Sequence, residues 1–339
     1  MNFARDRATF VIPHWTPDFR QSERHLDAAL HGILRQTDPN WRIVLIDDAS
    51  PDLAARAYLQ QVERQHPDRV HVIFKAINEG AGVCRNLGIQ WAQAQHSPIV
   101  LFNDADDLSD PRRLEVVRWV FVEQPTTGVV YSTFSVIDQD GQLVPLEEMT
   151  GSVAEVLEAH RHHPPQGENA WIAIGTETGY INHTSSTAVR TDLAIQYPFP
   201  AERVSEDSHT WFRYSAAGGP FVYVNQPLSS YRTTRDAAGS SSRAREGGKR
   251  GFYATKAKVD TAGFQEAIQI ALARNTIHQD QKDEILIRFH LRLGQTFARE
   301  GEVQLATEQV RAALAVSSRL TAQLIVEKGF AGQAWAHVG

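Results

Sequence analysis

Residues 8–107 alternate short β-rich runs with helical patterns. The helical patterns begin near Ser22, Leu53 and Gly80, and they separate the apolar runs ATFVIP, RIVLID, RVHVIF and PIVLFND. This alternation is typical of βαβ units, in which each helix crosses over a sheet of parallel strands. RIVLID and PIVLFND are almost continuously apolar and end in carboxylates, as expected of strands buried on both faces. The pattern predicts an α/β fold with a mostly parallel central sheet and a functional crevice at the C-terminal strand ends.

The chain divides into two parts of different pattern. From about Gly239 to Gly251 the sequence is rich in Gly, Ser, Arg and Lys, which is typical of a loop or linker, and beyond Phe252 it is helical in pattern. We predict a catalytic domain over residues 1–240 and a basic linker with a helical C-terminal region over residues 241–339. One stretch of that region resembles a tetratricopeptide hairpin, but a single copy cannot form a solenoid, which favours a plain helical appendage.

Composition limits the classes of function. With 42% hydrophobic and 22% charged residues, the 339-residue chain is not intrinsically disordered. A net charge of −6 lacks the basic footprint of a nucleic-acid-binding protein, so we expect no nucleic-acid partner. Cys84 is the only cysteine and cannot form an intramolecular disulfide, which suits a reducing compartment. The charged residues Arg5, Asp6 and Arg7 interrupt any signal-peptide pattern, and we expect a cytoplasmic protein of undetermined oligomeric state.

The segment Asn103–Asp107 reads NDADD and directly follows the buried run PIVLF. Carboxylates two residues apart at a strand end can converge on a hard divalent cation and leave positions open for the oxygens of a diphosphate. The spacing alone is weak, because a second D-x-D, Asp138 and Asp140, precedes Gly141 and fits a hairpin turn better. For Asn103–Asp107, a metal site and a turn with a helix cap are equally favoured by the residues alone.

An ordered set of segments resembles the family 2 glycosyltransferases, which are inverting enzymes of the GT-A nucleotide-sugar fold. The resemblance spans about residues 8–235, and it is specific as a set although each segment is loose by itself. It implies a GT-A domain that transfers a sugar from a UDP-sugar to a hydroxyl of a saccharide or glycoconjugate. The matching segments are Val11-Ile12-Pro13, Leu30–Thr37, Ile46–Asp52, Asn78–Gly88, Asn103–Asp107, Glu206-Asp207 and Tyr231-Arg232.

The resemblance implies a nucleotide-binding set at the strand ends. Asp48 matches the carboxylate that accepts the N3–H of uracil, although Asp-Ala-Ser-Pro-Asp is also good turn chemistry. Arg85 matches an arginine that faces the base or the phosphates; without the other motifs it would be an exposed helix residue. Pro13 ends the first strand motif, and Trp15 stands where the family often has Tyr-Asn, so its ring could stack on the base or pack on the strand end.

The resemblance also implies a cation and diphosphate site. Asp104 matches the residue that meets the ribose, and Asp106, with help from Asp104, matches the ligand of Mn²⁺ or Mg²⁺. Many family members carry a histidine after the Tyr-Arg motif, whereas this chain has Thr233-Thr234-Arg235, which leaves a third protein ligand in doubt. Arg232 and Arg235 are therefore candidates to contact the diphosphate.

Asp207 matches the general base of the family. The resemblance implies that Asp207 takes the proton of an acceptor hydroxyl while that oxygen attacks the anomeric carbon and UDP leaves from the opposite face, which inverts the configuration. An aspartate is ionised at neutral pH and can accept this proton. Taken alone, Asp207 would be a carboxylate at a helix N-terminus, stabilised by the helix dipole. The ordered motifs favour the base.

Other side chains are candidates for the acceptor site, because aromatic faces pack against the apolar face of sugars. For any single aromatic residue, packing in the core is the competing interpretation. The alternative for the whole chain is an inactive relative that binds glycans or proteins, although the retained Asp104, Asp106 and Asp207 favour an enzyme. The basic segment 243–258 could be a solvated linker, cover the donor diphosphate, or contact the anionic inner face of a membrane. The acceptor-site candidates are Trp171, Tyr180, His183, Glu206 and Trp211.

Overall fold

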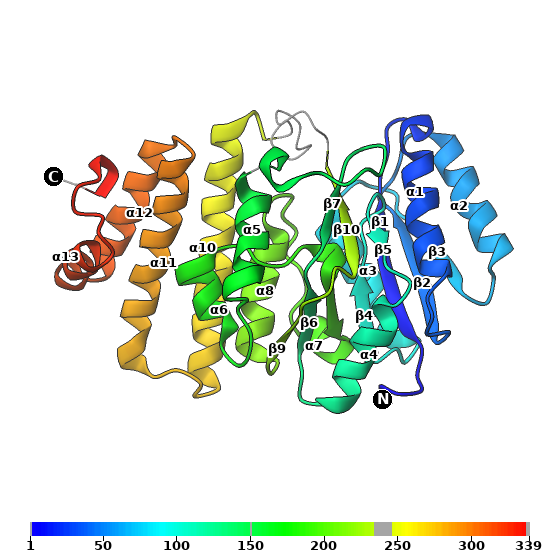
Figure 1. Ribbon diagram of the computed structural model, residues 1–339, viewed down its shortest axis with the longest axis horizontal. Coiled ribbons are helices and arrows are strands. Elements are labelled where there is room, and N and C mark those ends of the chain that lie inside the picture. The colour runs from blue at the N-terminus through cyan, green and yellow to red at the C-terminus, as the bar shows by residue number, and fades with distance from the viewer. Residues whose placement is uncertain (1, 150, 234–245, 337–339) are drawn as a thin grey trace.

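A seven-stranded sheet in the order β3-β2-β1-β4-β8-β6-β9 forms the centre of the molecule (Figure 1). The structure is a computed structural model that describes residues 2–149, 151–233 and 246–336. The first four strands in this order are parallel, so the predicted α/β fold with a mostly parallel sheet is confirmed. These strands are β1 (Ala8–His14), β2 (Trp41–Asp47), β3 (Val70–Phe74) and β4 (Ile99–Phe102).

The sheet continues beyond β4 with a reversed strand. β8 (Thr187–Arg190) is antiparallel both to β4 and to β6 (Val129–Ser132), and β9 (Phe221–Val224) is parallel to β6. Because β8 runs against β4, the residues just before β8 lie at the same edge as those just after β4. A second, three-stranded sheet covers this edge and consists of β5 (Leu108–Ser109), β10 (Ser229–Arg232) and β7 (Ser135–Ile137).

Helices cover both faces of the central sheet, because alternate residues of its buried strands point to opposite faces. In β1, Phe10 and Ile12 belong to the apolar core on one face and Val11 to the core on the other. Gly88 of α3 lets that helix approach β1 closely, since a Cβ there would lie 2.4 Å from Cγ1 of Val11. The first core contains residues of α1 (Phe19–Leu34), α2 (Leu53–Gln65) and α4 (Arg113–Glu123). The second contains residues of α3 (Ala81–Ala94), α7 (Thr191–Gln196) and α8 (Glu206–Ala217).

The first helix begins one turn before Ser22, the residue near which the sequence pattern predicts its start. Asp18 is its N-cap, and the Asp18 side chain accepts a hydrogen bond from the backbone N–H of Arg20 at 3.1 Å. Ser22 lies inside the helix instead, where its hydroxyl donates to the carbonyl of Phe19. Aspartate and serine are both good N-caps, so the sequence pattern alone does not distinguish them.

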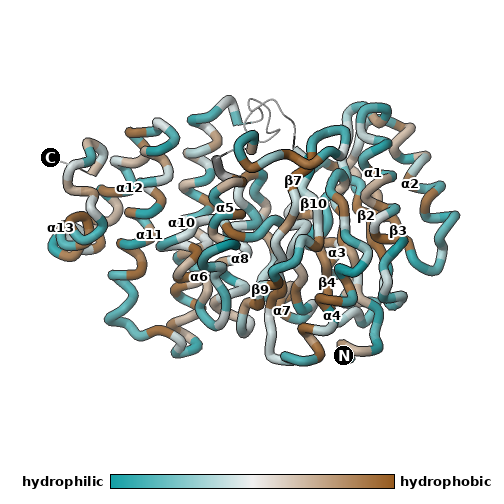
Figure 2. The backbone as a smooth tube through the Cα atoms, in the orientation of Figure 1, coloured by the Kyte–Doolittle hydropathy of each residue, from teal (hydrophilic) through white to brown (hydrophobic). Residues whose placement is uncertain are grey.

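The C-terminal region is helical, as predicted, and lies beside the sheet at the opposite end of the molecule from α1 and α2 (Figure 1). One continuous apolar cluster runs from the sheet through α8 into α10 (Lys249–Ala273), α11 (Gln279–Arg299) and α12 (Val303–Val316). Hydrophobic and hydrophilic residues alternate along these helices (Figure 2). The predicted boundary between residues 240 and 241 lies outside the described residues. Within the described residues, the further α-helices are α5 (Gly151–His162), α6 (Ala170–Ala173) and α13 (Ser318–Glu327).

Among the helices that the structure describes, none is long and apolar enough to cross a lipid bilayer.

Candidate active site

Two carboxylates and an imidazole meet at the edge where β4 ends and β8 begins. Ligand atoms of Asp104, Asp107 and His183 all lie within 4.8 Å of one another. Ser185 connects the two segments, because its hydroxyl donates to Oδ2 of Asp107 at 2.6 Å and accepts from the backbone N–H of Asp104 at 2.8 Å. The antiparallel pairing of β4 with β8 therefore brings His183, predicted for the acceptor site, to the NDADD segment.

The protonation of this cluster suits cation binding. Burial acts to raise the pKa of Asp104, but the charge of Arg85 outweighs it and holds that pKa below its usual value. Burial and the Asp104 charge raise the pKa of Asp107 to about 7. Burial lowers the pKa of His183, so the ring is neutral, and the lone pair of its Nδ1 accepts from the backbone N–H of Ser185 at 3.3 Å; a bound cation would take the place of this donor. Two carboxylates and a neutral imidazole fit a divalent cation.

Asp106, the predicted metal ligand, is exposed at the rim of the cluster. Desolvation by the surrounding side chains, followed by the charges of Asp107 and Asp104, raises the pKa of Asp106 to about 7. Its backbone carbonyl accepts a hydrogen bond from Nε of Arg232 at 2.8 Å. In the part of the chain that the structure describes, it is Asp107 rather than Asp106 that shares the cluster with Asp104 and His183, and the metal role of Asp106 stays a prediction.

Arg85 links this cluster to the start of α8. Its Nη2 donates to Oδ1 of Asp104 and its Nη1 to Oε1 of Glu206, both at 2.8 Å. Only 4% of the Arg85 side chain is exposed, so the alternative of an exposed helix residue is wrong. Burial acts to lower the pKa of Arg85, but the charges of Asp104 and Glu206 raise it above its usual value. Glu206, predicted for the acceptor site, is therefore an ion-pair partner of Arg85.

Asp207, the predicted base, is half-buried in the first turn of α8. Its Oδ1 accepts a hydrogen bond from the backbone N–H of Ser208 at 2.8 Å. The hydroxyl of Tyr180 also bonds to this carboxylate, and burial, followed by the Asp207 charge, raises the pKa of Tyr180 well above its usual value. Tyr180 therefore stays protonated and donates a hydrogen bond to Asp207. A helix-terminal carboxylate and a general base are both compatible with this position.

Asp48 lies at the end of β2 in a network that includes Lys75, a residue the sequence analysis missed. Oδ1 of Asp48 accepts from Nζ of Lys75 at 2.5 Å and from the backbone N–H of Glu79 at 3.0 Å, and Oδ2 accepts from the backbone N–H of Gly80 at 2.7 Å. The thiol of Cys84 also hydrogen-bonds to Asp48, so protein donors account for about four acceptor positions of this carboxylate. Trp15, at the end of the neighbouring strand β1, is 46% exposed.

Two predicted acceptor residues lie in the core. The side chains of Trp171 and Trp211 are buried, with 0% and 1% exposure, and pack edge-on against Phe264 and Tyr214, respectively. The structure thus contradicts an acceptor role for either ring, because neither reaches the surface. Pro13 lies within β1, as predicted.

Several basic side chains that were predicted to contact the donor diphosphate or a membrane form hydrogen bonds or ion pairs within the protein. The Arg232 guanidinium donates to the backbone carbonyls of Asp106, Asp138 and Gln139. Arg235, Arg243 and Arg245 lie outside the described residues. The described cations of segment 243–258 contact polar partners, in the pairs Lys249 with Glu300, Arg250 with Gln304, Lys256 with Asp260 and Lys258 with Glu202.

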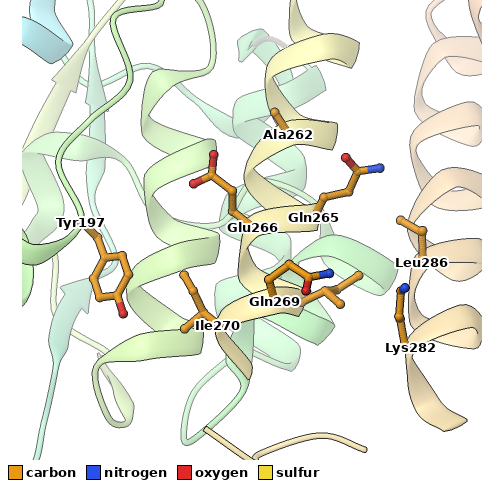
Figure 3. Close-up of a pocket in the computed structure, with 9 residues that line it drawn as sticks. Tyr197, Ala262, Gln265, Glu266, Gln269, Ile270, Lys282 and Leu286 are labelled. Carbon is orange, nitrogen blue, oxygen red and sulfur yellow. The ribbon is translucent and has the colours of Figure 1, made fainter. Parts of the chain in front are cut away.

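A hollow of about 670 Å³ lies on the C-terminal region, lined by residues of α10 and α11 with Tyr197 at its edge (Figure 3). Gln265 and Gln269 of α10 point toward α11, which carries Lys282, whereas Glu266 points toward α8. It contains none of the residues of the carboxylate cluster or of the Asp48 network.

A mostly parallel sheet covered by helices on both faces, with a carboxylate cluster at its strand ends, is typical of the GT-A class of nucleotide-sugar-binding folds. The model of the family "Glycosyl transferase family 2" matches residues 18–185. EpsE of Bacillus subtilis (strain 168), assigned to the glycosyltransferases, is 34% identical over 215 residues, which cover 63% of this chain and 70% of EpsE. The chain belongs to glycosyl transferase family 2.

Two solved structures are similar to this chain in fold. S. aureus TarS 1–349 in complex with UDP covers 95% of this chain and 92% of its own, with a TM-score of 0.52 and 14% identity. The mannosyltransferase PcManGT from Pyrobaculum calidifontis, in complex with GDP-Man and Mn²⁺, covers 98% of this chain and 82% of its own, with a TM-score of 0.53 and 19% identity. At these identities the likeness shows a shared GT-A fold.

Proposed function

We propose that this protein transfers a sugar from a UDP-sugar to a hydroxyl of a saccharide or glycoconjugate, with inversion at the anomeric carbon. The observation that carries the proposal is the Arg85 bridge, which joins Asp104 of the candidate cation cluster to Glu206, the neighbour of Asp207. A group that can hold a donor diphosphate and a group that can accept a proton therefore lie on either side of one buried arginine. Transfer by a single displacement needs both.

In the proposed reaction, Asp207 accepts the proton of the acceptor hydroxyl while the hydroxyl oxygen forms a bond to the anomeric carbon. The bond from that carbon to the diphosphate oxygen breaks, and its electron pair stays on UDP. Tyr180 donates a hydrogen bond to Asp207 and keeps its carboxylate oriented. Mn²⁺ or Mg²⁺, held by Asp104, Asp107 and His183, with Asp106 as a further candidate, would offset the charge on the leaving diphosphate.

The choice of UDP rests on Asp48. Asp48 matches the carboxylate that accepts the N3–H of uracil in the family resemblance, and the base would take the place of a protein donor such as the Cys84 thiol. Trp15 offers an exposed ring at the end of the neighbouring strand β1. The TarS neighbour binds UDP, whereas the PcManGT neighbour binds GDP-Man. A screen of UDP-glucose, UDP-GlcNAc and GDP-mannose for slow hydrolysis, with water as the acceptor, tests the choice.

The experiment that tests the base is Asp207→Asn. Asparagine keeps the size and can still cap the helix, but it cannot take a proton, so turnover falls about 10²–10⁴-fold while UDP affinity stays unchanged. Sugar-nucleotide turnover, calorimetric UDP binding and thermal melting are measured on the same preparation. Turnover within about threefold of wild type, or a product that retains the donor's anomeric configuration by NMR, would exclude the mechanism.

The cellular setting is part of the same proposal. We place the protein in the cytoplasm, with segment 243–258 as a candidate contact to an anionic membrane surface. Lys249, Arg250, Lys256 and Lys258 each contact a protein side chain, and these contacts would compete with lipid for the four cations. No observation in the described residues favours an inactive binding module over an enzyme.

A further inference from the structure

The residue before the Glu206-Asp207 pair has an unusual backbone conformation. Ser205 has φ 61° and ψ 18°, in the left-handed region that a residue with a side chain seldom adopts. It is the N-cap of α8, yet its side chain makes no capping hydrogen bond to that helix. Strained conformations of this kind persist only where surrounding contacts hold them.

Those contacts come from α10, about fifty residues away in the sequence. The Ser205 hydroxyl donates to Oδ1 of Asp260 at 2.6 Å and accepts from Nζ of Lys256 at 3.0 Å. Nζ of Lys256 also lies 2.7 Å from Oδ2 of Asp260, which closes a triangle of charge-assisted hydrogen bonds. Asp260 is 5% exposed, and the Lys256 side chain 19% exposed. We call Lys256, Asp260 and Ser205 the α10 clamp.

Lys256 and Asp260 of the α10 clamp belong to α10, which packs closely against α8. Gly263, one turn beyond Asp260, allows a close approach, since a Cβ there would lie 2.6 Å from Cα of His209. One further turn on, Glu266 points toward α8 (Figure 3), and its carboxylate lies 3.5 Å from the guanidinium of Arg213. Asp260 therefore belongs to the face of α10 that packs against α8, and it contacts the residue at which α8 begins.

We propose that Lys256 and Asp260 are positioning residues for Asp207, acting through the backbone of Ser205. This inference rests on the proposed base role of Asp207. The α10 clamp holds the left-handed turn from which the first turn of α8 starts, and that turn sets where the Asp207 carboxylate lies. A displacement of about 1 Å in a reacting group can cost up to about 10²-fold in rate. The C-terminal region thereby contributes to transfer without contacting donor or acceptor.

The test compares Asp260→Ala with Glu266→Gln, using the sugar nucleotide that the hydrolysis screen identifies. Both changes remove a contact between α10 and α8, but only Asp260→Ala breaks the α10 clamp. We expect Asp260→Ala to lower kcat about 10- to 100-fold with the donor KM and the UDP affinity unchanged. We expect Glu266→Gln to leave kcat within about twofold of wild type, because a half-exposed ion pair contributes little.

A second pair of variants separates backbone positioning from lost stability. Ser205→Ala and Ser205→Gly both remove the hydroxyl, but glycine adopts φ 61° without strain and alanine does not. We therefore expect Ser205→Gly to retain a higher kcat than Ser205→Ala at a temperature where both remain folded. This order would not follow from a role in stability alone.

Three results would overturn the inference. They are an Asp260→Ala kcat equal to that of Glu266→Gln, a joint loss of kcat, UDP affinity and melting temperature in Asp260→Ala, and equal kcat values for the two Ser205 variants. Failure of the proposed function gives a different result, because Asp207→Asn itself would then turn over like wild type.

Discussion

Replacing Arg85 with methionine removes a buried cation and leaves two carboxylates facing each other. Methionine has a similar length and no charge, so the packing near Phe199, whose ring lies 5.4 Å from the guanidinium carbon, is largely kept. Asp104 and Glu206, 28% and 14% exposed at their side chains, lose the donor that each shares at 2.8 Å. Removing one partner of such a buried set typically costs about 3–5 kcal/mol of unfolding free energy.

The assay is urea unfolding followed by circular dichroism, together with calorimetric titration of UDP in Mn²⁺. The matched control is Arg118→Met. Arg118 is also buried, with 8% of its side chain exposed, and pairs with Asp38 at 2.5 Å. Its guanidinium also donates to the carbonyl of Asn40, which lies just before the N-terminal end of β2 and so at the opposite end of the strand from the site. We expect both variants to lose similar stability, but only Arg85→Met to bind UDP more weakly.

A double-mutant cycle locates the cost. Changing Glu206→Gln in the Arg85→Met background removes an unpaired carboxylate, so we expect it to restore part of the lost stability. The interaction free energy should be about 1–3 kcal/mol. An Arg85→Met variant within about 1 kcal/mol of wild type, or a cycle that shows no interaction with Glu206, would refute the bridge as the element that joins the two halves of the site.

Two further predictions concern the cation cluster and the buried His209. With Asp107→Asn or His183→Gln, we expect UDP affinity in Mn²⁺ to fall to the value measured for wild type in EDTA. Calorimetric affinities equal to that of wild type in Mn²⁺ would contradict a cation site at this cluster. Asp106→Ala, titrated alongside, shows whether that carboxylate also ligates the cation. Burial and the charge of Arg213 lower the pKa of His209 to about 4, so the neutral ring contributes stability above pH 6.5 that is lost as the pH falls from 6.5 toward 4, up to about 3 kcal/mol. His209→Gln should flatten this dependence in urea unfolding at pH 7.5, 6 and 5, and an unchanged slope would be inconsistent with it.

Local patterns carry most of the fold of the N-terminal half. The apolar runs that end in Asp47 and Asp104 were predicted as strands buried on both faces because they are almost continuously apolar, and the structure contains these strands with helices on both faces of the sheet. Helix ends were less predictable, since Asp18 and Ser22 are both competent caps and tertiary packing of Phe19 decides between them. Phe19 is 4% exposed, which extends the helix back by one turn.

The site depends on pairings that the sequence does not reveal. His183 reaches the cluster because β8 pairs with β4, and no local pattern shows which distant strand occupies that position. Lys75 could have been found from the sequence, because it directly follows the predicted strand RVHVIF and Asp48 directly follows RIVLID. The C-terminal ends of neighbouring parallel strands lie close together, so a lysine and an aspartate at these positions can form an ion pair. Trp171 and Trp211 show the reverse error, since a large aromatic side chain suits a sugar site and a core equally well in sequence.

The charges at the start of α8 explain why a distant helix takes part in positioning it. Burial and the adjacent Asp207 raise the pKa of Glu206, because two neighbouring carboxylates repel each other. The helix dipole favours negative charge there by only about 0.3–1 kcal/mol. Arg85 neutralises one side of the pair, but it also pulls Glu206 toward Asp104. A fixed point on the other side is then needed, and Ser205, bound to Asp260 of α10, provides it within two residues of Asp207.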